Sequence, residues 1–205
     1  MKLPRLYAIA DASFFREGEK LLDFAQELAA GGVTLLQYRN KVDSARRILD
    51  DTLALRRALP EQVRLVMNDR VDLALAAGFG GAHVGQDDLS PESVRRLIGP
   101  DRWLGVSTHN PGQITEANAT SADYIAVGPV FATASKANPG PVIGLEGVRR
   151  ARVLTSKPLV AIGGITRENC QSVIAAGADS VAVISDLIAS PRTAAEDFLR
   201  LLSAY

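Results

Sequence analysis

The sequence contains one cysteine, Cys170, and only two histidines, His83 and His109, among its 205 residues. A single cysteine excludes an intrachain disulfide and is typical of a reducing, cytoplasmic setting. So few histidines and cysteines also argue against a zinc site. No apolar run approaches the roughly 20 residues of a transmembrane helix, and the apolar segment at Leu6 follows Met1 too closely for a signal peptide. We therefore expect a cytoplasmic protein that has no membrane partner.

An excess of charge of either sign is also absent, because 23 lysines and arginines balance 23 aspartates and glutamates. This balance excludes a broad surface for nucleic acid or anionic membranes, although it permits a local basic pocket. The chain has 47% hydrophobic residues and no linker or low-complexity segment, so it suits one domain with a full core. We expect a single domain over residues 1–205.

Short apolar segments alternate with amphipathic ones along the whole chain. The expected strands are Leu6–Ala10, Val33–Tyr38, Arg64–Met67, Ala82–Val84, Trp103–Val106, Tyr124–Val127, Leu159–Ile162 and Val181–Ile184. The expected helices are Glu19–Ala30, Asp43–Leu59, Asp69–Ala77, Pro91–Ile98, Pro111–Ala119, Leu145–Leu154, Arg167–Ala176 and Thr193–Leu202. Continuously apolar strands indicate a parallel sheet covered by helices. Eight such units in one domain predict a single (β/α)8 TIM barrel. An open doubly wound sheet is the alternative, but neither G-x-G-x-x-G after the first strand nor G-x-x-x-x-G-K-[ST] occurs.

Two carboxylates, Asp69 and Asp88, follow neighbouring strands of the predicted barrel. At an effective dielectric of roughly 20, two such charges about 4 Å apart repel each other by about 4 kcal/mol. A cation between them would remove this repulsion, and Mg²⁺ is the cofactor that we expect. The alternative for Asp69 is that it caps the following helix. Asp88 is less readily explained in this way, because Ser90 and Pro91 already supply an N-cap and an N1 proline.

Other polar and glycine residues also follow the expected strands. In a TIM barrel these positions share the C-terminal rim, where the catalytic groups of this fold lie. Gln37, Arg39 and Lys41 alternate along one strand end, so they can face a phosphate and a polar ring together, or simply form a solvated strand end. Gly163-Gly164 after the seventh strand and Ser185 after the eighth predict a phosphate site made by backbone amides.

Two further features have a functional and a structural interpretation. The connection Phe131–Gly144 follows the sixth strand, is rich in proline and glycine, and indicates an active-site loop. His83 lies at the end of a strand, where it could bind substrate or pyrophosphate, or could be a hydrogen-bonded structural histidine.

Several short motifs occur in a defined order along nearly the whole chain. They are Leu6–Asp11, the Q-x-R-x-K of Gln37, Arg39 and Lys41, Asn68–Ala74, His83–Asp88, Gly105–Ser107, Gly128–Thr133 with Lys136, Ala161–Ile165 and Val183–Ser185. Each motif is weak alone, but their order and spacing are specific. Together they resemble the thiamin-phosphate synthase family.

The resemblance implies a Mg²⁺-dependent transferase on a TIM barrel. It would join 4-amino-2-methyl-5-hydroxymethylpyrimidine diphosphate to 4-methyl-5-hydroxyethylthiazole phosphate, giving thiamin phosphate and pyrophosphate. The implied ligands of Mg²⁺ are Asp69 and Asp88, and the implied catalytic groups are Ser107 and Lys136. The residues implied to bind the pyrimidine diphosphate are Gln37, Arg39, Lys41, Asn68, His83, Ser107 and Lys136. Those implied to bind the thiazole phosphate are Thr133, Ser135, Gly164, Ile184 and Ser185. A homodimer is a further implication of the resemblance.

Three other functions remain open from the sequence. A thiazole tautomerase group shares the barrel and works without metal, but it commonly lacks the carboxylates and the Q-x-R-x-K that this chain has. A non-catalytic barrel could bind thiamin precursors as a regulator. A sugar-phosphate epimerase would explain Gly163-Gly164 but not the rim of two carboxylates and several cations. The chain also departs from the family at Thr133–Lys136, where T-x-S-K replaces the more usual T-x-T-K.

Overall fold

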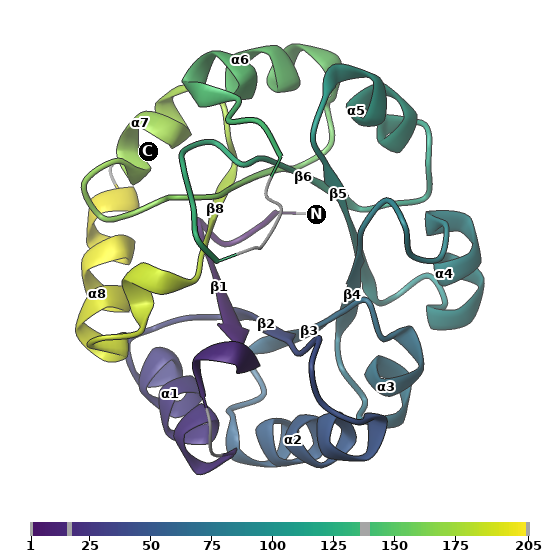
Figure 1. Ribbon diagram of the computed structural model, residues 1–205, viewed down its shortest axis with the longest axis vertical. Helices are drawn as coiled ribbons and strands as arrows, with labels where there is room; N and C mark the ends of the chain where they lie inside the picture. Colours follow the sequence, from purple (N-terminus) through teal and green to yellow (C-terminus); the bar gives the residue numbers. More distant parts are fainter. Residues whose placement is uncertain (1, 16–17, 136–139, 204–205) are drawn as a thin grey trace.

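Eight parallel strands close into a barrel in which each strand pairs with the next along the chain and β8 pairs with β1. The structure is a computed structural model that describes residues 2–15, 18–135 and 140–203. The strands are β1 (Leu6–Asp11), β2 (Leu35–Arg39), β3 (Arg64–Asn68), β4 (Gly81–Val84), β5 (Trp103–Thr108), β6 (Tyr124–Val127), β7 (Leu159–Ile162) and β8 (Ser180–Val183). Figure 1 looks along the barrel and shows the helices as an outer ring. The predicted TIM barrel is confirmed.

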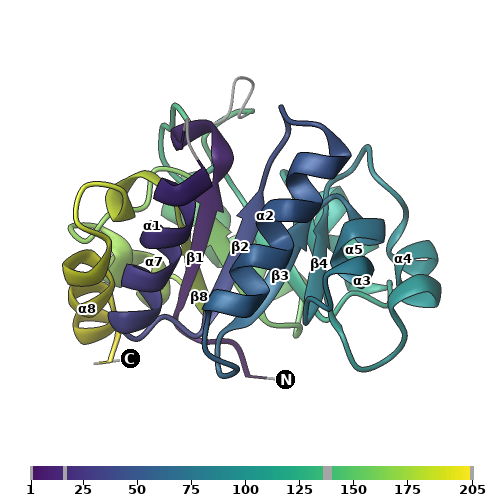
Figure 2. The same ribbon diagram turned by 90° about the horizontal axis from the view of Figure 1, so that it is seen from below.

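The helices lie between successive strands and cover the outside of the barrel (Figure 2). They are α1 (Gly18–Ala30), α2 (Ala45–Ala58), α3 (Val71–Ala76), α4 (Pro91–Ile98), α5 (Pro111–Asn118), α6 (Gly144–Leu154), α7 (Cys170–Ala175) and α8 (Pro191–Leu202). Two short 3-10 helices, η1 (Ala12–Phe14) and η2 (Ser185–Leu187), follow β1 and β8. Among the described residues, no helix is long and apolar enough to cross a membrane.

Alternation along each strand divides the core into two layers. In β1, Tyr7 and Ile9 belong to the small cluster inside the barrel, whereas Leu6, Ala8 and Ala10 pack against the helices. Both faces of the strand are buried, which explains why its sequence is continuously apolar. The inside of the barrel also contains tyrosines, so it is not a purely hydrocarbon core.

The start of α4 agrees with the sequence, whereas α2 begins at Ala45, after its cap Ser44, and not at the expected Asp43. Ser90 accepts a hydrogen bond from the Ser93 amide and Pro91 occupies the first turn, so α4 begins where we expected. By contrast, α3 begins at Val71 and α7 at Cys170, later than the expected Asp69 and Arg167. In both cases a polar turn continues from the strand before the helix begins.

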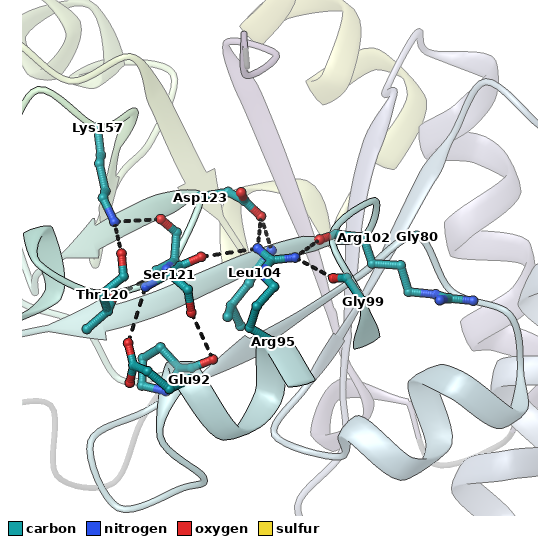
Figure 3. A network of polar contacts seen from close by, with 12 residues as sticks. Gly80, Glu92, Arg95, Gly99, Arg102, Leu104, Thr120, Ser121, Asp123 and Lys157 are labelled. Atoms are coloured by element: carbon teal, nitrogen blue, oxygen red, sulfur yellow. Dashed lines mark hydrogen bonds and ion pairs between the residues drawn. The ribbon is translucent and has the colours of Figure 1, made fainter. Parts of the chain in front are cut away.

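A network of charged side chains ties the loops together on the amino-terminal side of β5 and β6 (Figure 3). The Asp123 carboxylate accepts hydrogen bonds from Arg95 Nη2 at 2.6 Å and from the Leu104 amide at 2.7 Å. Lys157 Nζ donates to the carbonyl oxygens of Thr120 and Ala122. These contacts satisfy main-chain groups that the strands leave unpaired, so we assign the network to stability.

Candidate active site

The carboxylates of Asp69 and Asp88 meet at the carboxyl ends of β3 and β4. Burial raises the pKa of Asp69, and the adjacent Asp88 carboxyl raises it further, whereas the Lys41 ammonium opposes the shift. Lys41 Nζ lies 2.9 Å from Asp69 Oδ2. Asp88 Oδ2 accepts a hydrogen bond from the Gly85 amide at 2.7 Å, which holds its side chain back toward the strand. The sequence expectation that these two carboxylates converge is confirmed.

The main chain at Asp69 explains how its side chain is directed into the rim. Asp69 is the only described non-glycine residue with a positive φ, at 59°, and its amide donates to the His83 carbonyl at 2.8 Å. Arg70 takes the N-cap position of α3 and no side-chain cap bond is formed there. Asp69 therefore does not cap the helix, and a left-handed aspartate of this kind is typical of functional turns.

The basic residues of β2 and the loop after it each contact a carboxylate. Arg39 Nη1 forms an ion pair with Asp11 Oδ2, and the Asp11 side chain is almost fully buried. Asp11 also accepts hydrogen bonds from the Ser13 amide and hydroxyl, so it joins the β1 loop to β2. Lys41 therefore brings a positive charge to the carboxylate pair, whereas the charge of Arg39 is paired with Asp11.

Asn68 precedes Asp69 and has an unusual property. Its side chain is only 8% exposed, yet its Nδ2 is a buried polar atom with no hydrogen-bond partner within the described residues. A buried N–H donor without an acceptor is costly and rare in proteins. An acceptor from a bound molecule would satisfy it, so Asn68 is a strong candidate ligand-binding residue.

Gln37 and Ser107 belong to a hydrogen-bonded chain inside the barrel. Gln37 Nε2 donates to Tyr7 Oη at 2.9 Å, and Tyr7 Oη lies 2.9 Å from Tyr124 Oη. His83 Nδ1 lies 3.1 Å from Tyr124 Oη, and His83 Nε2 lies 2.8 Å from Ser107 Oγ. This satisfies both ring nitrogens of His83, which accords with the structural interpretation of this residue.

Burial shifts the pKa values of the ionisable groups in this hydrogen-bonded chain. Desolvation lowers the pKa of His83 to about 4, although the charge of Asp88 raises it slightly. Burial also raises the pKa values of Tyr7 and Tyr124 above the ordinary tyrosine value. All three groups are therefore neutral near pH 7, and the neutral His83 ring bridges Tyr124 and Ser107.

The second half of the rim is built around the Gly163-Gly164 turn after β7. Gly163 and Gly164 have φ values of 103° and 63°, and a Cβ on Gly164 would lie 2.4 Å from the Ala132 carbonyl oxygen. The Phe131 amide donates to the Gly163 carbonyl at 2.9 Å, so the β6 loop lies directly along this turn. Only glycine permits this close approach.

The other residues expected to bind a phosphate follow β6 and β8. Thr133 and Ser135 are half-buried, and the Ser135 amide donates to Thr133 Oγ1 at 3.2 Å. Ile184 is half-buried and Ser185 is exposed at the start of η2. Lys136 lies outside the described residues.

The loops after β7 and β8 are joined by an ion pair. Asp186, which follows Ser185, accepts hydrogen bonds from the Arg167 amide at 2.9 Å and from Arg167 Nε at 3.1 Å. This links the start of η2 to the loop that begins with Gly163-Gly164. The two loops therefore share one edge of the barrel.

Sequence reasoning missed three residues that organise this site, namely Asp11, Tyr7 and Tyr124. Tyr7 and Tyr124 lie in expected strands, and Asp11 directly follows one. They could have been identified as side chains with a polar end at inward-facing positions of the predicted closed barrel. Among the described residues, no group of three or more His, Cys, Asp or Glu side chains could hold a metal ion. A metal at this rim would therefore need oxygen ligands from a substrate or from water.

The arrangement of this rim can be compared with known proteins. A family model described as thiamine monophosphate synthase matches residues 6–187. The chain belongs to this family. It is 62% identical over 205 residues to the thiamine-phosphate synthase of Koribacter versatilis, with 98% of this chain and 97% of that protein covered. It is 44% identical to the thiamine-phosphate synthase of Chloroflexus aurantiacus, with 97% and 92% covered.

A solved structure supports the same family assignment as these two relatives. The thiamine phosphate pyrophosphorylase of Pyrococcus furiosus superposes with a TM-score of 0.86 and is 32% identical, covering 98% of this chain and 96% of that one. The family resemblance drawn from the motifs is thus confirmed for this thiamine monophosphate synthase family member.

Proposed function

We propose that this protein is a thiamine-phosphate synthase. It joins 4-amino-2-methyl-5-hydroxymethylpyrimidine diphosphate to 4-methyl-5-hydroxyethylthiazole phosphate and releases pyrophosphate. Family membership and the full-length relatives support this activity. The structural observation that carries it is the meeting of Asp69 and Asp88 beside Lys41 and Asn68, at one rim of the barrel.

The bond changes follow from the chemistry of the two substrates. The bond between the pyrimidine methylene carbon and the diphosphate oxygen breaks, and its electron pair leaves with the diphosphate. The electron-rich aminopyrimidine stabilises the resulting methylene cation, and the thiazole nitrogen then donates its lone pair to form the new C–N bond. This sequence needs donors that stabilise the leaving anion more than it needs a general base.

The residues of the rim supply those donors. Asn68 Nδ2 has no partner within the described residues and would donate to a diphosphate oxygen. Arg39, Lys41 and Lys136 would bring positive charge, and Ser107 Oγ would offer a hydroxyl. The Gly163-Gly164 turn, with Thr133, Ser135, Ile184 and Ser185 beside it, would bind the thiazole phosphate through backbone amides and hydroxyls.

The donor set also fits Mg²⁺. Two carboxylates on adjacent strand ends are hard oxygen ligands, and the pKa of Asp69 is raised by burial and, beyond that, by the adjacent Asp88 carboxyl. Mg²⁺ is usually held by one or two carboxylates together with substrate phosphates and water. Asp69 and Asp88 would hold the ion, which when bound would neutralise charge on the departing diphosphate.

Two other functions make different predictions. A thiazole tautomerase would act on a single phosphorylated thiazole without Mg²⁺ and would release no pyrophosphate. A regulator would bind thiamin phosphate tightly and turn over neither substrate. The carboxylate pair beside basic and amide groups favours the synthase over both. From the resemblance and composition we also propose a cytoplasmic homodimer, which sedimentation of the purified protein would test.

A coupled assay of pyrophosphate release tests the proposal. With both substrates and Mg²⁺ we expect continuous release, and with a chelator in place of Mg²⁺ we expect release to fall to background. Omitting the thiazole phosphate is the matched control, since a simple diphosphatase would continue without it. Release that is independent of the thiazole phosphate, or no release at all, would refute the proposal.

A further inference from the structure

A continuous hydrogen-bonded chain crosses the inside of the barrel and links two residues of the proposed site. It runs from Gln37 on β2 through Tyr7 on β1 to Tyr124 on β6. From Tyr124 it continues to His83 on β4 and ends at Ser107 on β5. Tyr7, Gln37, Tyr124 and His83 are all buried. In this buried setting each link is strengthened by the low local dielectric, and a group left without its partner is costly.

Gly105 leaves space for the central link of this chain. It pairs with His83 on one side and with Tyr124 on the other in the strand register. A Cβ at Gly105 would lie 2.1 Å from Tyr124 Cζ and 2.4 Å from His83 Nδ1. Any larger residue at this position would push the tyrosine and the histidine apart. The barrel wall is therefore shaped to allow the contact.

The direction of each hydrogen bond in the chain dictates the next one. A phenol has one proton to donate, and a neutral imidazole has one N–H and one lone pair. When Gln37 donates to Tyr7, the acceptor for the Tyr7 proton within the described residues is Tyr124 Oη, and Tyr124 then donates to His83 Nδ1. His83 then carries its proton on Nε2 and donates it to Ser107. The hydroxyl proton of Ser107 is left for a bound ligand.

The reverse direction also satisfies every link. Gln37 would then accept from Tyr7 through Oε1, and Tyr124 would accept from His83 Nδ1. In that state Ser107 donates its proton to His83 Nε2 and offers a ligand only its lone pairs. The two ends of the chain are thus coupled, because turning the Gln37 amide reverses what Ser107 can offer.

We propose that Tyr7 and Tyr124 are positioning residues that couple the orientation of the Gln37 amide to the hydrogen bond that Ser107 offers. The inference rests on the proposed function, in which Ser107 faces the departing diphosphate. A ligand amine that donates to Gln37 Oε1 keeps the amide nitrogen directed at Tyr7. Ser107 then donates to the anion, so binding of an aminopyrimidine ring aligns a donor for the leaving group.

Kinetics with matched tyrosine variants test the coupling. Tyr124→Phe removes the central hydroxyl, and we expect kcat to fall about tenfold while the KM for the pyrimidine diphosphate changes less than about twofold, since the lost orientation matters as charge develops. Tyr38→Phe is the control, because Tyr38 is equally buried but its hydroxyl bonds Asp51 and Asn40 outside this chain. Equal kcat values for the two variants would overturn the proposal.

A second readout needs no catalysis. In wild type, ¹⁵N shifts of the His83 ring should report the Nε2–H tautomer. Gln37→Glu introduces a carboxylate that, once ionised, can only accept, so His83 should change to the Nδ1–H tautomer at the far end of the chain. The double variant Gln37→Glu/Tyr124→Phe should not make this change.

The pH for this measurement is chosen from a titration of the carboxyl that Gln37→Glu introduces. The ¹³C shift of that carboxyl shows at which pH it is ionised. At a pH where it is ionised, an unchanged Nε2–H tautomer of His83 would overturn the coupling. The same change of tautomer in the double variant would also overturn it, because the signal would then bypass Tyr124. An inactive wild type would refute the proposed synthase, while the tautomer change would still test the chain.

Discussion

The buried neutral His83 should make the stability of this protein depend on pH in a defined way. Its pKa is lowered from 6.5 to about 4, chiefly because burial penalises the charged ring. Between these values the unfolded chain binds a proton that the folded chain does not, so stability falls as pH falls from about 6.5 toward 4. At about 1.4 kcal/mol per pKa unit, lowering the pH from 7 to 5 should cost about 2 kcal/mol through this residue alone.

The assay is urea unfolding followed by circular dichroism at pH 7, 6 and 5, with a chelator present, for wild type and for His83→Gln. Glutamine cannot titrate, so the variant should lose about 2 kcal/mol less stability than wild type across this range. Asp69 has a raised pKa and acts with the opposite sign, but it is present in both proteins and cancels in the difference. Parallel curves of unfolding free energy against pH would refute the neutral, buried state of His83.

Five other substitutions separate the roles of the two sides of the barrel. Asp88→Ala and Lys136→Ala should each lower turnover by about two to three orders of magnitude, the usual effect of losing a charge-stabilising group, and near-normal turnover of both would remove them from the mechanism. Asp69→Asn should raise the unfolding midpoint of the ligand-free protein at pH 7, because the raised pKa means that the ionised Asp69 carboxylate lowers stability at that pH. The gain should vanish below about pH 4, where Asp69 is protonated in both the folded and the unfolded protein. A lower midpoint at pH 7 would contradict this. Gly164→Ala should raise the KM for the thiazole phosphate, because its Cβ would lie 2.4 Å from the Ala132 oxygen, and an unchanged KM would place the phosphate elsewhere. Asp123→Ala, on the opposite side of the barrel, should lower the unfolding free energy by about 1–3 kcal/mol, because the Leu104 amide loses its side-chain acceptor and Arg95 loses its carboxylate partner. Arg95 keeps its bonds to the carbonyl oxygens of Gly99, Arg102 and Ser121, and kcat should stay within about twofold of wild type.

The fold could be predicted because its signals are local. Continuously apolar strands indicate burial on both faces, and glycines with positive φ at positions 32, 78 and 177 end α1, α3 and α7 as their sequence context suggests. Ser90 and Pro91 likewise define the start of α4. The start of α3 could not be predicted in this way, because the left-handed backbone at Asp69 delays the helix and nothing in the local sequence requires it.

The site was predicted where its residues end neighbouring strands. Asp69 and Asp88 could be paired from the order of the strands alone, because parallel neighbours end at one rim. The partners of Arg39 and Gln37 could not be predicted, because the order of the strands does not give the register that places Asp11 beside Arg39 or the side-chain direction that brings Gln37 to Tyr7. The link between Tyr7 and Tyr124 depends on closure of the barrel, because the two residues are 117 positions apart.

Quantifying both products tests the proposed synthase activity. Purified protein would be incubated with both substrates and Mg²⁺, and thiamin phosphate and pyrophosphate would be quantified from the same samples. We expect one thiamin phosphate for each pyrophosphate in wild type, and neither product above background in the Asp69→Ala/Asp88→Ala variant. Thiamin phosphate formed at the wild-type rate by that variant, or pyrophosphate released without thiamin phosphate, would contradict it.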